Sequence, residues 1–292
     1  MNMKSWLLAL VAVSSALAMS ASFGQQNRDW NAIQITPHQV AAGLYYLEGT
    51  GGHIGLLVGD DGIIMIDDQF APLSEKIYAA IRKISDQPIR FLINTHIHPD
   101  HVGGNAYFGG MGIPIVARDN VYLRLTQRGT AKAALPVLTF GAAVTLHLNG
   151  QDIRVVPTPP AHTDGDSYIH FLGSDVIHAG DVFRTVAYPR VDDQSGGTFE
   201  GSLAALQLLI DMAGPNTTII PGHGVLSTRD DVIKFRDMAI EVRDRVSRLI
   251  DQGMTLEQIT AARPTADIDA EWGFEPPDLL LPVLYNELTH AN

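Results

Sequence analysis

Four side chains that can bind a metal ion occur within six residues of this sequence, directly after an apolar segment. They lie in the run His96-Ile97-His98-Pro99-Asp100-His101, and residues 91–93 before it are expected to form a buried strand. The chain has no cysteine, so the zinc ligands that remain are imidazole and carboxylate groups. Because His96 and His98 alternate with Ile97, both can project to one side of an extended turn. The run therefore predicts a metal site.

Three more candidate ligands share one context, an apolar strand that ends in a loop marked by Gly or Pro. They are His162, Asp181 and His223, which follow the apolar segments 155–156, 176–177 and 219–220. Ligands converge on such strand-end loops in layered α/β folds. Five His and two Asp are too many for one zinc ion with an open position and suit two ions, which usually share a carboxylate. The count suggests two ions that share Asp181.

Strands and helices alternate along the rest of the chain, which predicts one α/β domain with helices on both sides of its core. Apolar runs predict strands at 44–47, 54–58, 63–66 and 168–172, and helical spacing predicts helices near 77–84 and 203–210. We expect a long helix to begin near Ser227 with Asp230 as its capping partner, and a shorter one to begin at Thr255 with Gln258. Residues 120–140 are expected either to cover the cleft or to pack on the core as an edge helix.

The first 24 residues have the layout of a secretory signal: Lys4, an apolar stretch over 6–18, and small residues up to Gly24. The stretch is shorter than the ~20 residues that a spanning helix needs. We expect a periplasmic or secreted protein with no membrane insertion after cleavage, so that residues 25–292 form a single domain. An uncleaved membrane anchor is the alternative. The net charge of −12 argues against a nucleic-acid partner, which needs clustered Lys and Arg, and nothing in the sequence predicts the oligomeric state.

These motifs make the chain resemble the metallo-β-lactamase superfamily over nearly all of residues 40–250. The shared motif is His-x-His-x-Asp-His at 96–101, and the later His162, Asp181 and His223 match as well, as does Asp67 at the end of the third strand. The resemblance implies an αββα four-layer sandwich with its site along one edge of the two sheets.

The resemblance also implies a ligand set for two zinc ions. The first ion would take His96, His98 and His162, and the second would take Asp100, His101 and His223. Asp181 would bridge the two ions, and Asp67 would orient a ligand imidazole or the loop that carries it. A site of nitrogen and oxygen alone could also accept iron or manganese.

The chemistry predicted for this site is hydrolysis of a small-molecule carbonyl compound by a hydroxide held between the two zinc ions. Asp100 would hydrogen-bond the water and pass a proton to the leaving group. A cyclic amide such as a β-lactam ranks first, because an exported enzyme meets such compounds before they reach the cell wall. A lactone or a thioester is the alternative, since one group of these lactamases has Cys at the position of Asp181.

Two further expectations concern the site and a competing function. Phe183, Arg184 and Tyr188 follow Asp181 and are predicted to contact substrate, with Arg184 on a substrate carboxylate.

Glu is typical of the iron-dependent members of the superfamily at the position of His98, which argues against oxygen reduction by this protein. The function of another class that stays open is a non-catalytic periplasmic metal-binding or accessory protein, because holding a metal does not by itself provide an open coordination position.

Overall fold

The structure is a computed structural model that describes residues 28–272 and 277–290. The chain divides into two compact units, Met1–Gln34 and Ile35–Asn292, and the fold described below is that of the second. The predicted secretory signal at 1–24 lies outside the described residues. Within the described ranges, no helix has both the length and the apolar character that crossing a bilayer requires.

The first sheet has seven strands in chain order. They are β1 (Thr36–Ala41), β2 (Leu44–Glu48), β3 (Ile54–Gly59), β4 (Gly62–Ile66), β5 (Ile89–Ile93), β6 (Ile115–Arg118) and β7 (Leu138–Phe140). Strands β1 to β4 pair antiparallel, and β4 to β7 pair parallel. The turn from β3 to β4 passes through Asp60-Asp61-Gly62, where Gly62 has a φ of 121°. That conformation favours glycine.

The second sheet has five strands in the order β12-β11-β10-β9-β8. They are β8 (Val144–Leu148), β9 (Gln151–Pro157), β10 (Ser167–Phe171), β11 (Val176–His178) and β12 (Thr218–Ile220). Leu57 and Ile64 of the first sheet share one buried cluster with Ile153, Val155 and Ile169 of the second. The two sheets therefore face each other across an apolar core.

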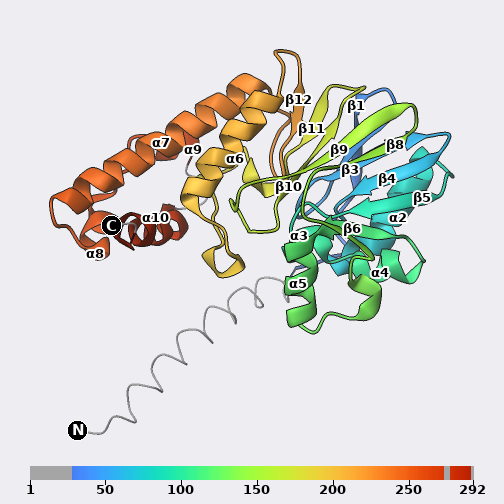
Figure 1. The fold of residues 1–292 in the computed structure, drawn as a ribbon, viewed down its shortest axis with the longest axis horizontal. Coiled ribbons are helices and arrows are strands. Elements are labelled where there is room, and N and C mark those ends of the chain that lie inside the picture. Colours follow the sequence, from blue (N-terminus) through green and yellow to red (C-terminus); the bar gives the residue numbers. More distant parts are fainter. Residues whose placement is uncertain (1–27, 273–276, 291–292) are drawn as a thin grey trace, which may run out of the picture. The chain divides into compact units, whose positions relative to one another are not determined.

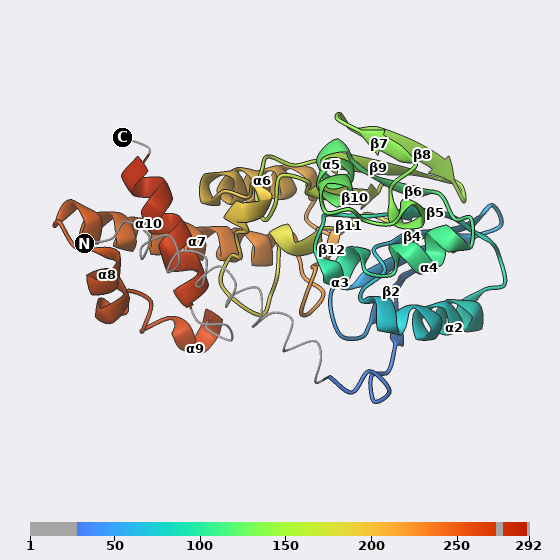
Figure 2. The same cartoon turned by 90° about the horizontal axis from the view of Figure 1, so that it is seen from below.

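Helices cover the outer faces of both sheets (Figures 1 and 2). On the first sheet's side lie η1 (Ala71–Leu73), α2 (Ser74–Ile84), α3 (Pro99–Val102), α4 (Asn105–Gly110), α5 (Asp119–Gln127) and η2 (Lys132–Ala134). After β11 come η3 (Gly180–Val182), η4 (Asp193–Ser195), α6 (Phe199–Met212), α7 (Arg229–Asp251), α8 (Leu256–Ala262), α9 (Asp269–Trp272), η5 (Pro277–Leu279) and α10 (Leu280–His290). Side chains of α6, α7 and α10 share a buried cluster with Ile177 and Ile219 of the second sheet. The predicted αββα sandwich is confirmed.

Two local predictions have different outcomes. The cap predicted at Thr255 and Gln258 is confirmed as a reciprocal capping box. The long helix instead begins one residue later than predicted, because its capping box joins Thr228 and Asp231. The backbone of Ser227 pairs in both directions with Ile219 of β12, and its hydroxyl donates to the carbonyl of Val225, so the side chain of Thr228 caps the helix.

The expected edge helix forms in only part of residues 120–140, because α5 covers Asp119–Gln127 whereas Leu138–Phe140 form β7. Val121 and Leu125 of α5 lie in a buried cluster with Ile97 and Ala117, so the apolar face of this helix is used by the core.

Candidate metal centre

Each predicted ligand lies just beyond the end of a strand, and the strands come from both sheets. Residues 96–101 follow β5 of the first sheet. In the second sheet, His162 follows β9, Asp181 follows β11, and His223 follows β12. Chain segments far apart in sequence therefore meet at one end of the sandwich. The structure brings all seven predicted ligands together in two neighbouring groups.

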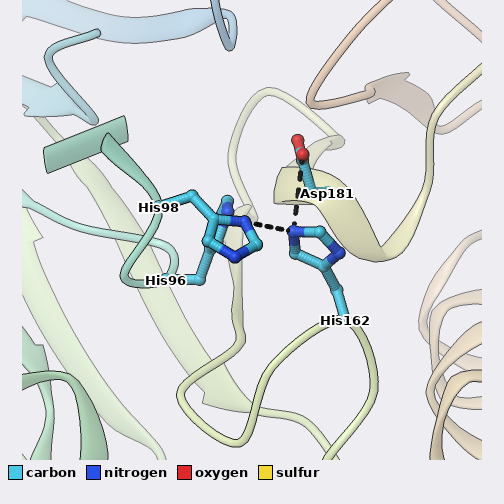
Figure 3. A group of neighbouring side chains, drawn as sticks. All are labelled: His96, His98, His162 and Asp181. Atoms are coloured by element: carbon cyan, nitrogen blue, oxygen red, sulfur yellow. Dashed lines mark hydrogen bonds and ion pairs between the residues drawn. The ribbon is translucent and has the colours of Figure 1, made fainter. Parts of the chain in front are cut away.

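The first group consists of His96, His98, His162 and Asp181, whose donor atoms lie within 4.8 Å of one another. Figure 3 shows these four side chains gathered together, with dashed lines that join His162 to His98 and to Asp181. His98 Nδ1 lies 2.7 Å from His162 Nε2, and Asp181 Oδ2 lies 3.5 Å from the same His162 nitrogen. Three nitrogens and one carboxylate oxygen at this separation match the ligand count of a tetrahedral zinc site.

The second group consists of Asp100, His101 and His223, again with donor atoms within 4.8 Å. His223 Nε2 lies 3.3 Å from Asp100 Oδ2 and 3.2 Å from Asp181 Oδ1. His101 Nε2 is also 3.2 Å from Asp181 Oδ1. One oxygen of Asp181 thus faces the first group and the other faces the second, which is the placement of a bridging carboxylate.

Three buried atoms at this junction make no hydrogen bond of acceptable geometry within the described residues. They are His96 Nε2, His101 Nε2 and Asp181 Oδ1. Leaving a buried polar atom without a partner costs about 1–3 kcal/mol, and all three atoms belong to residues of the two ligand groups. Metal ions would satisfy them, and imidazole and carboxylate donors suit zinc. The residues present therefore fit a metal centre.

Burial and charge divide the histidines into two kinds. Burial lowers the pKa of His96 well below its usual value and lowers that of His162 to about 3, so both imidazoles are neutral and able to donate a lone pair. Burial acts in the same direction on His101 and His223, but it is outweighed by carboxylates. The carboxylates of Asp181, Asp67 and Asp100 raise the pKa of His101. Asp181 and Asp100 raise the pKa of His223 to about 9. The second group therefore has the larger excess of negative charge.

Asp67 fixes the imidazole of His101. Its Oδ2 accepts hydrogen bonds from His101 Nδ1 and Thr95 Oγ1, both at 2.7 Å, and its Oδ1 accepts from the Thr95 backbone N–H at 2.7 Å. With Nδ1 bound to Asp67, the other ring nitrogen of His101 is the one that faces Asp181. Asp67 has a φ of 61°, in a region that non-glycine residues rarely occupy, which directs its carboxylate back beneath the ligand loop.

Two glycines permit the close approach of the ligands. A Cβ on Gly52 would lie 2.1 Å from His101 Cε1, and a Cβ on Gly222 would lie 2.0 Å from Asp181 Oδ1. Any larger residue would have to displace a candidate ligand. The role of these two glycines was not predicted from the sequence, although Gly222 lies directly before the candidate ligand His223.

The three predicted substrate contacts lie in different surroundings. Phe183 is 1% exposed and packs edge-on against Phe235, and Tyr188 is 3% exposed and donates its hydroxyl to Asp269. Both belong to the apolar core beneath α6 and α7, so they have no surface for a substrate, and this part of the prediction is corrected. Arg184 does lie at the centre, with Nε 3.8 Å from Asp181 Oδ2, but it too is buried.

Comparisons with known proteins agree with this geometry. A family model for the metallo-β-lactamase superfamily matches residues 47–223. The linear primary-alkylsulfatase of Pseudomonas sp. (strain ATCC 19151) is 26% identical over 124 residues, which is 39% of this chain and 24% of that protein. The 2,4-dinitroanisole O-demethylase subunit alpha of Nocardioides sp. (strain JS1661) is 26% identical over 140 residues, or 46% of this chain and 42% of that one. The chain thus matches less than half the length of either relative.

Solved structures show the same fold. A metallo-β-lactamase from Pontibacter korlensis aligns with a TM-score of 0.63 at 16% identity, covering 70% of this chain and 99% of the other. The DIM-1 metallo-β-lactamase aligns with a TM-score of 0.63 at 15% identity, covering 71% and 98%. The chain shares with these proteins two facing sheets, and its strand ends carry His and Asp side chains that could hold metal ions. The chain belongs to the metallo-β-lactamase superfamily.

Proposed function

We propose that this protein is an exported hydrolase whose centre holds two zinc ions, one in each group of ligands. The observation that carries the proposal is the junction at Asp181, where one carboxylate faces both groups and three buried donor atoms make no hydrogen bond within the described residues. His96, His98 and His162 would hold the first ion, and Asp100, His101 and His223 the second. Bound zinc supplies Lewis acidity, which polarises a carbonyl and makes water nucleophilic at neutral pH.

The opening of the centre to solvent is defined by its least buried members. The side chains of His98, Asp100 and His223 are 18%, 22% and 20% exposed, whereas those of His101 and His162 are 0% and 1% exposed. A substrate would therefore approach across Asp100. Burial raises the pKa of Asp100, but the charges of His101 and His223 outweigh it and hold that pKa below its usual range. Asp100 is thus ionised at neutral pH, and the role proposed for it is to hydrogen-bond the water and pass a proton to the leaving group.

The substrate proposed first is a cyclic amide such as a β-lactam. A lactone or thioester is the alternative. The name of one relative, a linear primary-alkylsulfatase, adds a sulfate ester to the bonds that should be tested.

The test uses the purified chain after removal of any bound metal and reconstitution with zinc. Turnover of a β-lactam chromogen, an acyl lactone, an acyl thioester and an alkyl sulfate is compared with and without chelator, and with an Asp100→Asn variant. We expect zinc-dependent turnover that is fastest for the β-lactam and that falls at least about a hundredfold in the variant. Zinc-dependent turnover of another member of the panel would replace the β-lactam as substrate. Zinc binding without turnover of any of the four would favour the accessory protein.

A further inference from the structure

His98 differs from the other histidines of the first group in how its ring is held. His98 Nδ1 faces His162 Nε2 at 2.7 Å, so Nδ1 is the atom directed into the group (Figure 3). The other ring nitrogen, Nε2, lies 2.8 Å from Asp192 Oδ2. Asp192 is far from His98 in sequence and follows none of the strand ends that carry the ligands.

A carboxylate beside an imidazole determines which ring nitrogen carries the proton. An ionised carboxylate only accepts hydrogen bonds, so in a neutral His98 imidazole the 2.8 Å contact places the single proton on Nε2. The lone pair is then on Nδ1, the atom that faces the metal group. We propose that Asp192 is a positioning residue that fixes His98 in its Nε2–H tautomer and thereby presents Nδ1 to the metal. This inference rests on the metal centre proposed above.

The backbone around Asp192 is tied to the other ligand loop of the same group. Asp192 donates its backbone N–H to the carbonyl of His162, and His162 Nδ1 lies 2.6 Å from the carbonyl oxygen of Arg190. Arg124 of α5 binds Asp164 through two nitrogens at 2.7 and 2.6 Å, and Asp164 N–H donates to the carbonyl of Ser195. Helix α5 and segment 190–195 thus hold the loop that carries His162 and Asp164, so Asp192 has a fixed place from which to orient His98.

Both oxygens of Asp192 are used, which makes the Asn variant informative. Asp192 Oδ1 accepts the backbone N–H of Ser195 at 3.0 Å as the N-terminal cap of η4. In Asp192→Asn the single remaining oxygen can keep this cap, and the amide NH₂ then faces His98 Nε2. That NH₂ is a donor, so it favours a lone pair on Nε2 and a proton on Nδ1. The variant would keep the local fold and reverse the tautomer.

The first measurement is the tautomer itself, in metal-free protein labelled with ¹⁵N at histidine. Long-range ¹H–¹⁵N spectra at about pH 8 distinguish the two tautomers, and a His98→Gln spectrum identifies the signals of His98. We expect Nε2–H in the wild type and a shift toward Nδ1–H in Asp192→Asn. The matched control is Asp193→Asn, which removes an equal charge from the exposed neighbouring residue and should leave the tautomer unchanged.

The second measurement is zinc affinity, by competition with a chromophoric chelator. Loss of such a hydrogen-bonding partner typically costs 10–100-fold in metal affinity. We expect a loss of that size in one zinc-binding step of Asp192→Asn and none in Asp193→Asn. An unchanged tautomer together with unchanged affinity in Asp192→Asn, or equal losses in both variants, would overturn the inference. Failure of the wild type to bind zinc would instead overturn the metal centre itself.

Discussion

The substitution Gly222→Ala tests whether the crowding around Asp181 is as tight as the structure shows. An added Cβ would lie 2.0 Å from Asp181 Oδ1 and 2.7 Å from the carbonyl oxygen of Gly180. Real Cβ contacts are essentially never shorter than 3.0 Å, so the carboxylate or the backbone must move by about 1 Å. The backbone resists such movement, because Gly222 N–H donates to the carbonyls of both Gly180 and Phe183.

The magnitude follows from this displacement. Overpacking of a rigid site costs about 1–3 kcal/mol, and at roughly 2–4 °C per kcal/mol the Tm of the metal-free protein should fall by about 2–12 °C. Metal–ligand distances tolerate changes of only about 0.2 Å. A shift of Asp181 several times larger should therefore weaken zinc binding at least about tenfold.

Calorimetry of the metal-free protein and zinc competition give the two readouts, and Gly110→Ala is the matched control. A Cβ at Gly110 would have nothing within 4 Å, and this residue lies at the end of α4 without a positive φ. The control should melt and bind zinc as the wild type does. If Gly222→Ala had the same Tm and zinc affinity as Gly110→Ala, the packing around Asp181 would be looser than the structure shows, and the prediction would be wrong.

Two further predictions concern residues that support the centre, and a third concerns the buried His53. Gly52→Ala should weaken zinc binding at least about tenfold, because its Cβ would lie 2.1 Å from the ring of His101; a chelator titration with wild-type affinity would contradict this. Asp67→Ala should lower the free energy of unfolding by about 3 kcal/mol or more, measured in urea, because buried donors of His101 and Thr95 lose their acceptor; a loss under about 1 kcal/mol would refute it. Burial lowers the pKa of His53 to about 4, so between about pH 6.5 and 4 the unfolded chain binds a proton that the folded chain does not. The metal-free wild type should therefore lose up to about 3 kcal/mol relative to His53→Gln as the pH falls through that range, and urea curves that shift in parallel for the two proteins would count against it.

The candidate ligands could be predicted from sequence because metal chemistry restricts residue type and because apolar runs mark where strands end. The run at 96–101 and the three strand-end residues could be identified without knowing how the strands pair. Their grouping around Asp181, by contrast, depends on which of its oxygens faces which loop. That arrangement arises only when β11 of one sheet lies opposite the loop after β5 of the other.

The residues that support the ligands were harder to predict. Asp192 lies in a polar segment outside any strand, and its partner His98 is 94 residues away, so no local pattern connects the two. Phe183 and Tyr188 were predicted to contact substrate because they follow Asp181 in sequence. The chain turns after η3, however, and directs both side chains under the helices. Proximity in sequence to a ligand did not determine which way a side chain faces.

The most direct test of the account is the number of zinc ions that the purified chain retains after reconstitution and removal of excess metal, measured by native mass spectrometry. The two groups of donors that meet at Asp181 predict two ions per chain. Replacement of His162 by Gln, which takes one nitrogen from the first group alone, should leave one ion. A wild-type chain that retains no zinc, or a variant that still holds two ions as tightly as the wild type, would contradict the account.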